Sequence, residues 1–227
     1  MGNTYIEIKN VSRAIKNNLV LDNINLNIEK GKIYGFRGKN GSGKTMLFRA
    51  ISGLINIDEG EIIIDNKVLG KDISFPESLG VLIEYPGFLP NLSGFKNLKY
   101  LADIKKIVSN DDIEMAIKNV GLDPKDNKKY RKYSLGMKQR LGIAQAIMEN
   151  PDLIILDEPT NALDIDGVKL INDIILDLKK QGKTILIANH DKEELENVAD
   201  EILLIDRGRI IKNESIGDSD KWKNLYY

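Results

Sequence analysis

The chain has 227 residues, enough for one domain or two tightly packed lobes with a sizeable core. Its 33 Lys and Arg residues nearly balance 34 Asp and Glu residues, so the net charge of −1 excludes a histone-like or basic-tail role. With no cysteine and one histidine, disulfides, thiolate or His-cluster metal sites and a cysteine nucleophile are excluded. No segment approaches the roughly 18 uncharged apolar residues of a membrane helix, so we expect neither a membrane span nor a signal peptide.

The first part of the chain has strand patterns. Residues Thr4–Lys9 and Val20–Ile28 alternate polar and apolar side chains, which predicts two β-strands. A short apolar run, Lys32–Phe36, precedes a glycine-rich stretch and a helical pattern over Thr45–Leu54, so a strand, a tight loop and a helix are expected in that order. Two further short strands are predicted at Glu61–Ile64 and Gly80–Ile83.

The middle of the chain has helical periodicity instead. From Ser93 to Asn150 apolar residues recur at helical spacing, which predicts a helical insert. Strands return as two continuous apolar runs, Leu153–Leu156 and Thr184–Ala188, typical of a buried parallel sheet, with a helix over Val168–Lys180 between them. A closing hairpin is expected from Glu201–Ile205 and Arg209–Lys212. We therefore predict an α/β fold, with a mixed sheet core from residues 1–84 and 151–227 and a helical subdomain over residues 85–150.

The glycine-rich stretch fits the pattern G-x-x-x-x-G-K-[ST] between a strand and a helix. It consists of Gly38, Lys39, Asn40, Gly41, Ser42, Gly43, Lys44 and Thr45. Glycines let backbone N–H groups point at phosphate oxygens, at the start of a helix whose dipole favours anions. We expect Lys44 to contact the β- and γ-phosphates and the Thr45 hydroxyl to bind Mg²⁺. A chance glycine-rich turn is the alternative, and the flanking strand and helix argue against it.

A second acidic element follows the buried strand Leu153–Leu156. Asp157, at the carboxyl end of that strand, can hold a water of the Mg²⁺ shell, and Glu158 can orient or deprotonate a water that attacks the γ-phosphate. A solvated acidic pair is the plainer interpretation. The apolar strand before it and the phosphate loop in the same chain favour hydrolysis of a nucleoside triphosphate.

Two further segments, Asp157–Asp164 (DEPTNALD) and Tyr133–Arg140 (YSLGMKQR), complete a resemblance to the ATP-binding subunits of ABC transporters. The resemblance covers essentially the whole chain, and Tyr133–Arg140 is similar to the signature motif of that family. It implies an ABC-type P-loop NTPase fold with an N-terminal antiparallel β-subdomain, and ATP and Mg²⁺ as cofactors. It also implies a head-to-tail homodimer or paired ATPase subunit, in which each ATP lies between one phosphate loop and the other protomer's signature.

The resemblance assigns roles to individual residues. The signature residues that face the ATP of the opposite protomer are Ser134, Leu135, Gly136 and Met137. The D-loop, which couples the two ATP sites, is Asn161, Ala162, Leu163 and Asp164. Taken alone, Ser134 and Asp164 are also plausible helix N-caps, and the two roles can coexist. His190, the single histidine, matches the switch histidine that contacts the γ-phosphate, so the expected catalytic set is Lys44, Glu158 and His190.

Three positions depart from the family pattern. Leu135 stands where the signature usually has its first glycine. Glu84 stands where most members have a glutamine that senses Mg²⁺, so the expected metal-binding residues are Thr45, Glu84 and Asp157. Ile15 occupies the place of an aromatic residue that stacks on adenine, and it enters the expected ATP site in that role.

The region Leu82–Leu92 and the signature look most like the branch that exports peptide antibiotics such as bacitracin and lantibiotics. The apolar side chains of Tyr85, Phe88 and Leu89 in this region predict either a docking surface for a helix of a membrane partner or packing between the lobes. We therefore expect a cytoplasmic ATPase, peripheral on the inner face of the membrane, that powers a separate transmembrane permease. No nucleic-acid partner is expected.

Two other classes of protein remain open. One is a soluble ABC-type ATPase that acts on a macromolecule; the single ATP site and the missing coiled-coil arms and basic tail count against it. The other is a P-loop kinase or GTPase. The signature segment counts against that class, as does the missing Asn-Lys-x-Asp pattern by which GTPases read guanine.

Overall fold

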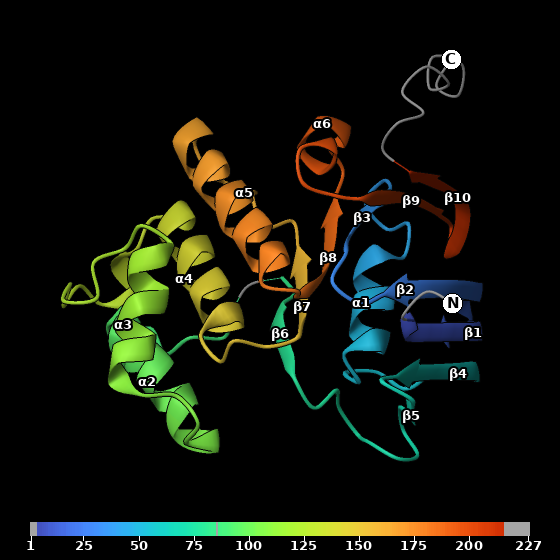
Figure 1. Ribbon diagram of the computed structural model, residues 1–227, viewed down its shortest axis with the longest axis horizontal. Coiled ribbons are helices and arrows are strands. Elements are labelled where there is room, and N and C mark those ends of the chain that lie inside the picture. The colour runs from blue at the N-terminus through green and yellow to red at the C-terminus, as the bar shows by residue number, and fades with distance from the viewer. Residues whose placement is uncertain (1–3, 85, 216–227) are drawn as a thin grey trace. The chain divides into compact units, whose positions relative to one another are not determined.

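The computed structural model describes residues 4–84 and 86–215 (Figure 1). The chain forms two compact units. Unit 1 is built from the residues up to Pro76 and from Leu186 onward, and unit 2 is Glu77–Ile185. The division predicted from the sequence, a core of residues 1–84 and 151–227 with a helical subdomain over residues 85–150, stays a prediction. The observed division places the predicted strands Gly80–Ile83 and Leu153–Leu156 with the helical segment.

Unit 1 contains an antiparallel sheet in the order β2-β1-β4-β5. Its strands are β1 (Thr4–Ile15), β2 (Asn18–Glu29), β4 (Glu59–Ile64) and β5 (Lys67–Val68). The central strand β1 places Ile6 opposite Ile28 on one side and Ile64 on the other, and all three side chains are buried. The alternating pattern thus buries one face of the sheet, as the sequence predicted.

The second part of unit 1 carries the phosphate loop. It consists of β3 (Ile33–Arg37), α1 (Lys44–Ile51), β8 (Thr184–Asn189, which begins in unit 2), α6 (Lys192–Glu196), β9 (Glu201–Asp206) and β10 (Arg209–Ser215). Strand β3 pairs in parallel with β9, which pairs antiparallel with β10. The rings of Phe36 and Phe48 meet edge to face, 5.1 Å between centroids, and so pack α1 onto β3.

Unit 2 combines two parallel strands with helices. Its elements are β6 (Leu79–Leu82), α2 (Gly94–Lys105), α3 (Asn110–Asn119), a short 3₁₀ helix (Tyr130–Lys132), α4 (Leu135–Ile147), β7 (Leu153–Asp157) and α5 (Ile165–Lys180). Helix α4 contacts β6, β7 and α3. At Gly80 a Cβ atom would lie 1.8 Å from the carbonyl oxygen of Ala146, so β6 can approach α4 this closely only through a glycine.

Most helix starts are capped by the residue types that sequence rules favour. In α2 to α6 the residue before the helix is Ser or Asp, and its side-chain oxygen accepts a backbone N–H of the first turn. These caps are Ser93, Ser109, Ser134, Asp164 and Asp191. The predicted α/β fold is confirmed, and two elements that periodicity did not predict, β5 and α6, are added. Within the residues described above, no helix is long and apolar enough to span a membrane.

Candidate functional site

The phosphate loop lies between β3 and α1 in unit 1, as predicted. Lys44 opens α1, and its side chain is 5% exposed. Its ammonium donates to the carbonyl oxygens of Gly38, at 2.7 Å, and Lys39, at 3.3 Å. A buried cation is therefore held across the loop by the loop's own backbone, which concentrates positive charge where an anion would bind.

The start of α1 is suited to a phosphate. Its N-cap is Gly43, with φ of 111°, and among the described residues no side chain caps this end and no acidic residue lies in its first turn. Ser42 Oγ is buried and has no hydrogen-bond partner within the described part of the chain. A Cβ atom at Gly38 would lie 2.5 Å from that hydroxyl. An unsatisfied hydroxyl beside a helix N-terminus fits an oxygen-rich anion such as a triphosphate.

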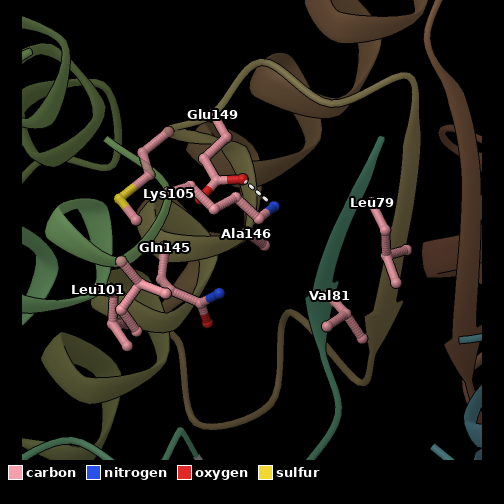
Figure 2. A pocket seen from close by; sticks show the side chains of 9 residues that line it. Leu79, Val81, Leu101, Lys105, Gln145, Ala146 and Glu149 are labelled. Atoms are coloured by element: carbon pink, nitrogen blue, oxygen red, sulfur yellow. Dashed lines mark hydrogen bonds and ion pairs between the residues drawn. The ribbon is translucent and has the colours of Figure 1, made fainter. Parts of the chain in front are cut away.

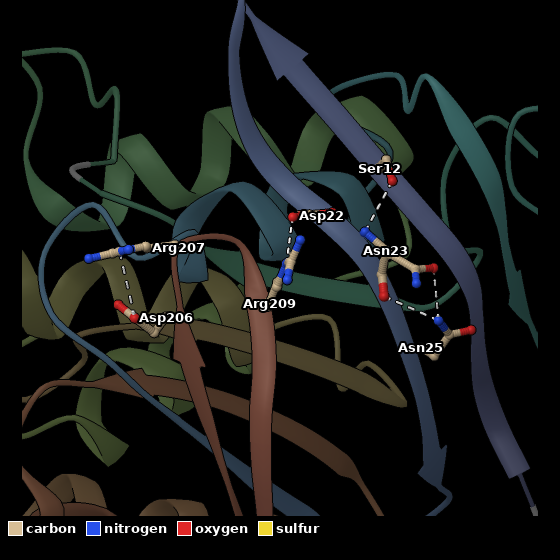
Figure 3. A network of polar contacts seen from close by, with 7 residues as sticks. All are labelled: Ser12, Asp22, Asn23, Asn25, Asp206, Arg207 and Arg209. Atoms are coloured by element: carbon tan, nitrogen blue, oxygen red, sulfur yellow. Dashed lines mark hydrogen bonds and ion pairs between the residues drawn. The ribbon is translucent and has the colours of Figure 1, made fainter. Parts of the chain in front are cut away.

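The turn between β9 and β10 supports this loop from within unit 1. Gly208 donates its N–H to the carbonyl oxygen of Ser42 at 2.8 Å, and accepts from the N–H of Asp22 at 2.9 Å. Arg209 Nε lies 2.5 Å from the carboxylate of Asp22 (Figure 3). The phosphate loop is thus held by contacts among three segments that are separate in the sequence: β2, the loop itself and the β9–β10 turn. The sequence motifs did not identify these contacts.

Two other predicted residues also belong to unit 1. Ile15 ends β1, and its side chain is 38% exposed. His190 follows β8 and is exposed. Its neighbours are well held: Asn189 donates to the Glu194 carboxylate at 2.7 Å and accepts the N–H of Asp191 at 3.0 Å. The buried Asn189 is a supporting residue that the sequence did not reveal, because an asparagine after a strand has no distinctive spacing.

The acidic pair of unit 2 stands at the end of β7. Asp157 is the last residue of the strand, as predicted, and its side chain is buried. Glu158 follows with φ of 49°, a left-handed backbone. Its carbonyl oxygen accepts the side-chain amide of Gln139 at 2.9 Å and the N–H of Asn161 at 3.2 Å. Sequence reasoning included Gln139 in the signature segment but gave it no role.

The signature segment and the D-loop meet in unit 2. Ser134 Oγ accepts the N–H three residues later at 3.2 Å, and Asp164 does the same at 2.9 Å, so both are N-caps. A Cβ atom on Gly136 would lie 3.1 Å from the carbonyl oxygen of Ala162, so α4 begins in close contact with the D-loop. Leu135, the departure from the family pattern, is 49% exposed.

The segment after β6 carries the other predicted residues of unit 2. Glu84 is exposed and has φ of 58°. Phe88 packs edge to face against Tyr130, 5.2 Å between ring centroids, whereas Leu89 is 45% exposed. Phe88 thus packs inside unit 2, which neither interpretation predicted, and the exposed Leu89 fits the predicted docking surface. Tyr85 lies outside the described residues.

A hollow of about 220 Å³ lies elsewhere in unit 2 (Figure 2). Its lining comes from β6, the end of α2 and the end of α4, and consists of Leu79, Val81, Leu101, Ile104, Lys105, Gln145, Ala146, Met148 and Glu149. An ion pair of 2.6 Å joins Lys105 to Glu149. Ile104 is 72% exposed and Ile107, two residues beyond α2, is 65% exposed. An apolar surface with a charged pair beside it is typical of an interaction site.

Comparison with known proteins agrees with these motifs. A family model described as "ABC transporter" matches residues 21–161. The uncharacterized ABC transporter ATP-binding protein YybJ of Bacillus subtilis (strain 168) is 52% identical, over 93% of this chain and 97% of its own length. The bacitracin transport ATP-binding protein BcrA of Enterococcus faecalis is 38% identical, over 97% of this chain and 72% of its own. The lantibiotic transport ATP-binding protein SrtF of Streptococcus pyogenes is 36% identical, over 97% of this chain and 95% of its own length.

Solved structures show the same relationship. The dimeric structure of MJ0796, a bacterial ABC transporter cassette, superposes with a TM-score of 0.86 at 27% identity, over 93% of this chain and 98% of that chain. A dimeric post-hydrolysis state of MJ0796 bound to ADP and Pi superposes with a TM-score of 0.84 at 25% identity, again over 93% of this chain and 98% of that chain. The fold and the motifs define an ABC-type ATPase with a mixed α/β architecture. This chain belongs to the ABC transporter family and is one of its ATP-binding subunits.

Proposed function

We propose that this chain binds ATP with Mg²⁺, pairs head to tail with a second copy or a paired ATPase subunit, and hydrolyses ATP to drive a separate membrane permease. The observation that carries the proposal is the phosphate loop, where a buried ammonium and an uncapped helix start meet an unsatisfied hydroxyl. This arrangement suits the β- and γ-phosphates of a nucleotide.

The metal in this proposal is Mg²⁺, bound by Thr45, Glu84 and Asp157. Among the residues that the structure describes, no group of three or more His, Asp and Glu gathers as a metal cluster. Mg²⁺ keeps several waters and is bound in proteins by phosphate oxygens beside one or two carboxylates. When bound, Mg²⁺ neutralises charge on the phosphates. Ile15 would contact the adenine base.

Hydrolysis is assigned to three side chains. Glu158 orients or deprotonates the attacking water, Lys44 stabilises the charge that develops on the γ-phosphate, and His190 positions that phosphate. In the paired state, the start of α4 would meet the γ-phosphate of the partner's ATP through Ser134 and Gly136. Support comes from the geometry of α4, whose capped N-terminus carries no acidic residue in its first turn.

The transported molecule is proposed from the relatives. BcrA and SrtF are named for transport of bacitracin and a lantibiotic, and each aligns with 97% of this chain. We infer that the cargo of the permease is a peptide antibiotic or a similar amphiphile, moved outward. The membrane partner would place the chain on the inner face of the cell membrane. The exposed apolar side chains of Ile104 and of Leu89 support such a partner.

Light scattering on the Glu158→Gln chain tests the paired ATPase. This variant should bind ATP but hardly hydrolyse it, and ATP with Mg²⁺ should double its mass. Adding Ser134→Arg should abolish the dimer by blocking the signature. Ser109→Arg is the matched control, because it removes a Ser N-cap from α3 of the same unit. A monomer that binds ATP, or near-normal turnover by Glu158→Gln, would contradict the proposal.

A further inference from the structure

We propose that Gln139 is a positioning residue for Glu158, and that it links the start of α4 to the catalytic carboxylate of the same protomer. The inference rests on the proposed function, in which Glu158 activates the attacking water. It adds a residue that acts through its contact with the Glu158 backbone and has no contact with ATP of its own.

The contact itself is short and shielded. Gln139 is 7% exposed, and its Nε2 donates to the carbonyl oxygen of Glu158 at 2.9 Å. The N–H of Asn161 donates to the same oxygen at 3.2 Å. Two donors from different parts of the chain therefore fix one peptide unit, and a partly buried hydrogen bond of this kind is stronger than one fully exposed to water.

The backbone that Gln139 holds is an unusual one. Glu158 has φ of 49°, a value that residues other than glycine seldom adopt. Such a conformation persists only where the surrounding structure holds it. The Cα–Cβ bond leaves this backbone in a direction that φ and the adjoining peptide planes set. The carboxylate then lies near Asn161, whose Nδ2 is 3.4 Å from Oε2. Loss of the side-chain amide of Gln139 should therefore change the position and orientation of the Glu158 carboxylate.

Helix α4 touches the segment after β7 at two points. Near its start, Gly136 approaches the carbonyl oxygen of Ala162, and one turn later Gln139 reaches Glu158. Ser134 caps the same helix. Because a helix moves as a rigid element over so short a length, a displacement of its N-terminus is passed to both contacts. ATP of the opposite protomer, bound at Ser134, would in this way bias the position of Glu158.

Steady-state ATPase kinetics of Gln139→Leu and Gln139→Glu test the inference. Leucine keeps much of the volume but removes the donor, so we expect kcat to fall by about tenfold or more with KM for ATP nearly unchanged. Glutamate keeps the shape, and only its protonated form can donate to the carbonyl of Glu158. Its kcat relative to wild type should therefore rise as the pH falls from about 8 to about 6. That ratio also decides the question if Gln139→Leu does not fold.

Matched controls separate a positioning role from a general effect of removing a glutamine. Gln181→Leu and Gln181→Glu make the same changes at an exposed glutamine after α5 and should leave kcat and its pH profile unchanged. Wild-type kcat in both Gln139 variants, or a Gln139→Glu ratio that does not vary with pH, would overturn the inference. If Glu158→Gln itself turned over normally, the proposed function would fail instead, so the two failures are distinguishable.

Discussion

The N–H of Gly208 donates a 2.8 Å hydrogen bond to the carbonyl oxygen of Ser42, which ties the β9–β10 turn to the phosphate loop. Gly208 has φ of 76°, and a Cβ atom on it would lie 2.7 Å from the carbonyl oxygen of Val20. The turn can therefore reach both β2 and the phosphate loop only with glycine at this position. Asp22 and Arg209 close the same contact with an ion pair (Figure 3).

We expect Gly208→Ala to lower the free energy of unfolding and to weaken ATP binding severalfold. The left-handed backbone alone should cost about 1–2 kcal/mol, and the collision with Val20 adds to it. Gly182→Ala is the control for backbone strain, because φ there is 81° and a Cβ would meet no atom within 4 Å. Urea unfolding and a nucleotide titration check this. Equal losses in the two variants would show that the contact with the phosphate loop has no effect.

A second prediction concerns acid stability near Ile15. Asp58 accepts the N–H of Ala14 at 2.7 Å and pairs with Arg13. The N–H bond, and then the guanidinium, hold the pKa of Asp58 below its usual value. A carboxyl whose pKa is lowered by folding stabilises the protein above its unfolded pKa of about 3.9, and this contribution is lost as the pH falls through the folded value.

The variant Asp58→Asn removes that contribution. Its deficit in unfolding free energy relative to wild type should be present at about pH 6 and should shrink as the pH falls below about 4. The effect is small because the carboxylate is exposed to solvent. Urea unfolding of both proteins over this range measures it. A deficit that does not change with pH would mean that the pKa of Asp58 is not lowered by folding.

Strong local patterns predicted most of the fold and the placement of the motifs. The apolar run before Asp157 and the glycine pattern before Lys44 each require one type of local structure, and both were located to within a residue or two. Strand β1 is longer than predicted, running to Ile15 instead of Lys9. Its register shifts between Ile8 and Val11, and such bulges interrupt the alternation on which strand prediction depends.

The rest of the site could not be predicted because it consists of contacts between distant segments. Gln139 and Glu158 are 19 positions apart in the sequence, and Gly208 and Ser42 are separated by many more residues. Neither separation produces a pattern that periodicity detects. Helix α6, with 5 residues, is too short to show an apolar stripe and depends on its cap, Asp191. Motif reading therefore found the residues proposed to meet ATP and missed those that hold them.

A third prediction tests Glu84, which stands where most family members have glutamine. A carboxylate is a better Mg²⁺ ligand than an amide, so Glu84→Gln should raise the Mg²⁺ concentration that gives half-maximal ATPase, by about threefold or more. Glu77→Gln makes the same change at another exposed glutamate of unit 2 and should leave the titration unchanged. An unaltered Mg²⁺ titration in Glu84→Gln would contradict a role for this carboxylate at the metal.

The last prediction concerns the apolar surface of unit 2. Ile104 is 72% exposed and is one of the residues that line the hollow between β6, α2 and α4. An exposed isoleucine at a helix end is stabilised by a partner that covers it. Ile104→Asp should therefore release a tagged chain from the membrane fraction of cells that contain its permease. ATP binding by the purified variant should not change, because Ile104 lies outside the phosphate loop.

The matched control is Leu54→Asp, which places the same charge on an exposed residue of unit 1. It should leave the chain in the membrane fraction. Release by both variants would indicate a general loss of solubility or folding, and circular dichroism would reveal it. If Ile104→Asp stayed with the membrane, the permease would have to bind another surface. If the wild-type chain itself were never found there, a soluble ABC-type ATPase that acts on a macromolecule would become the better description.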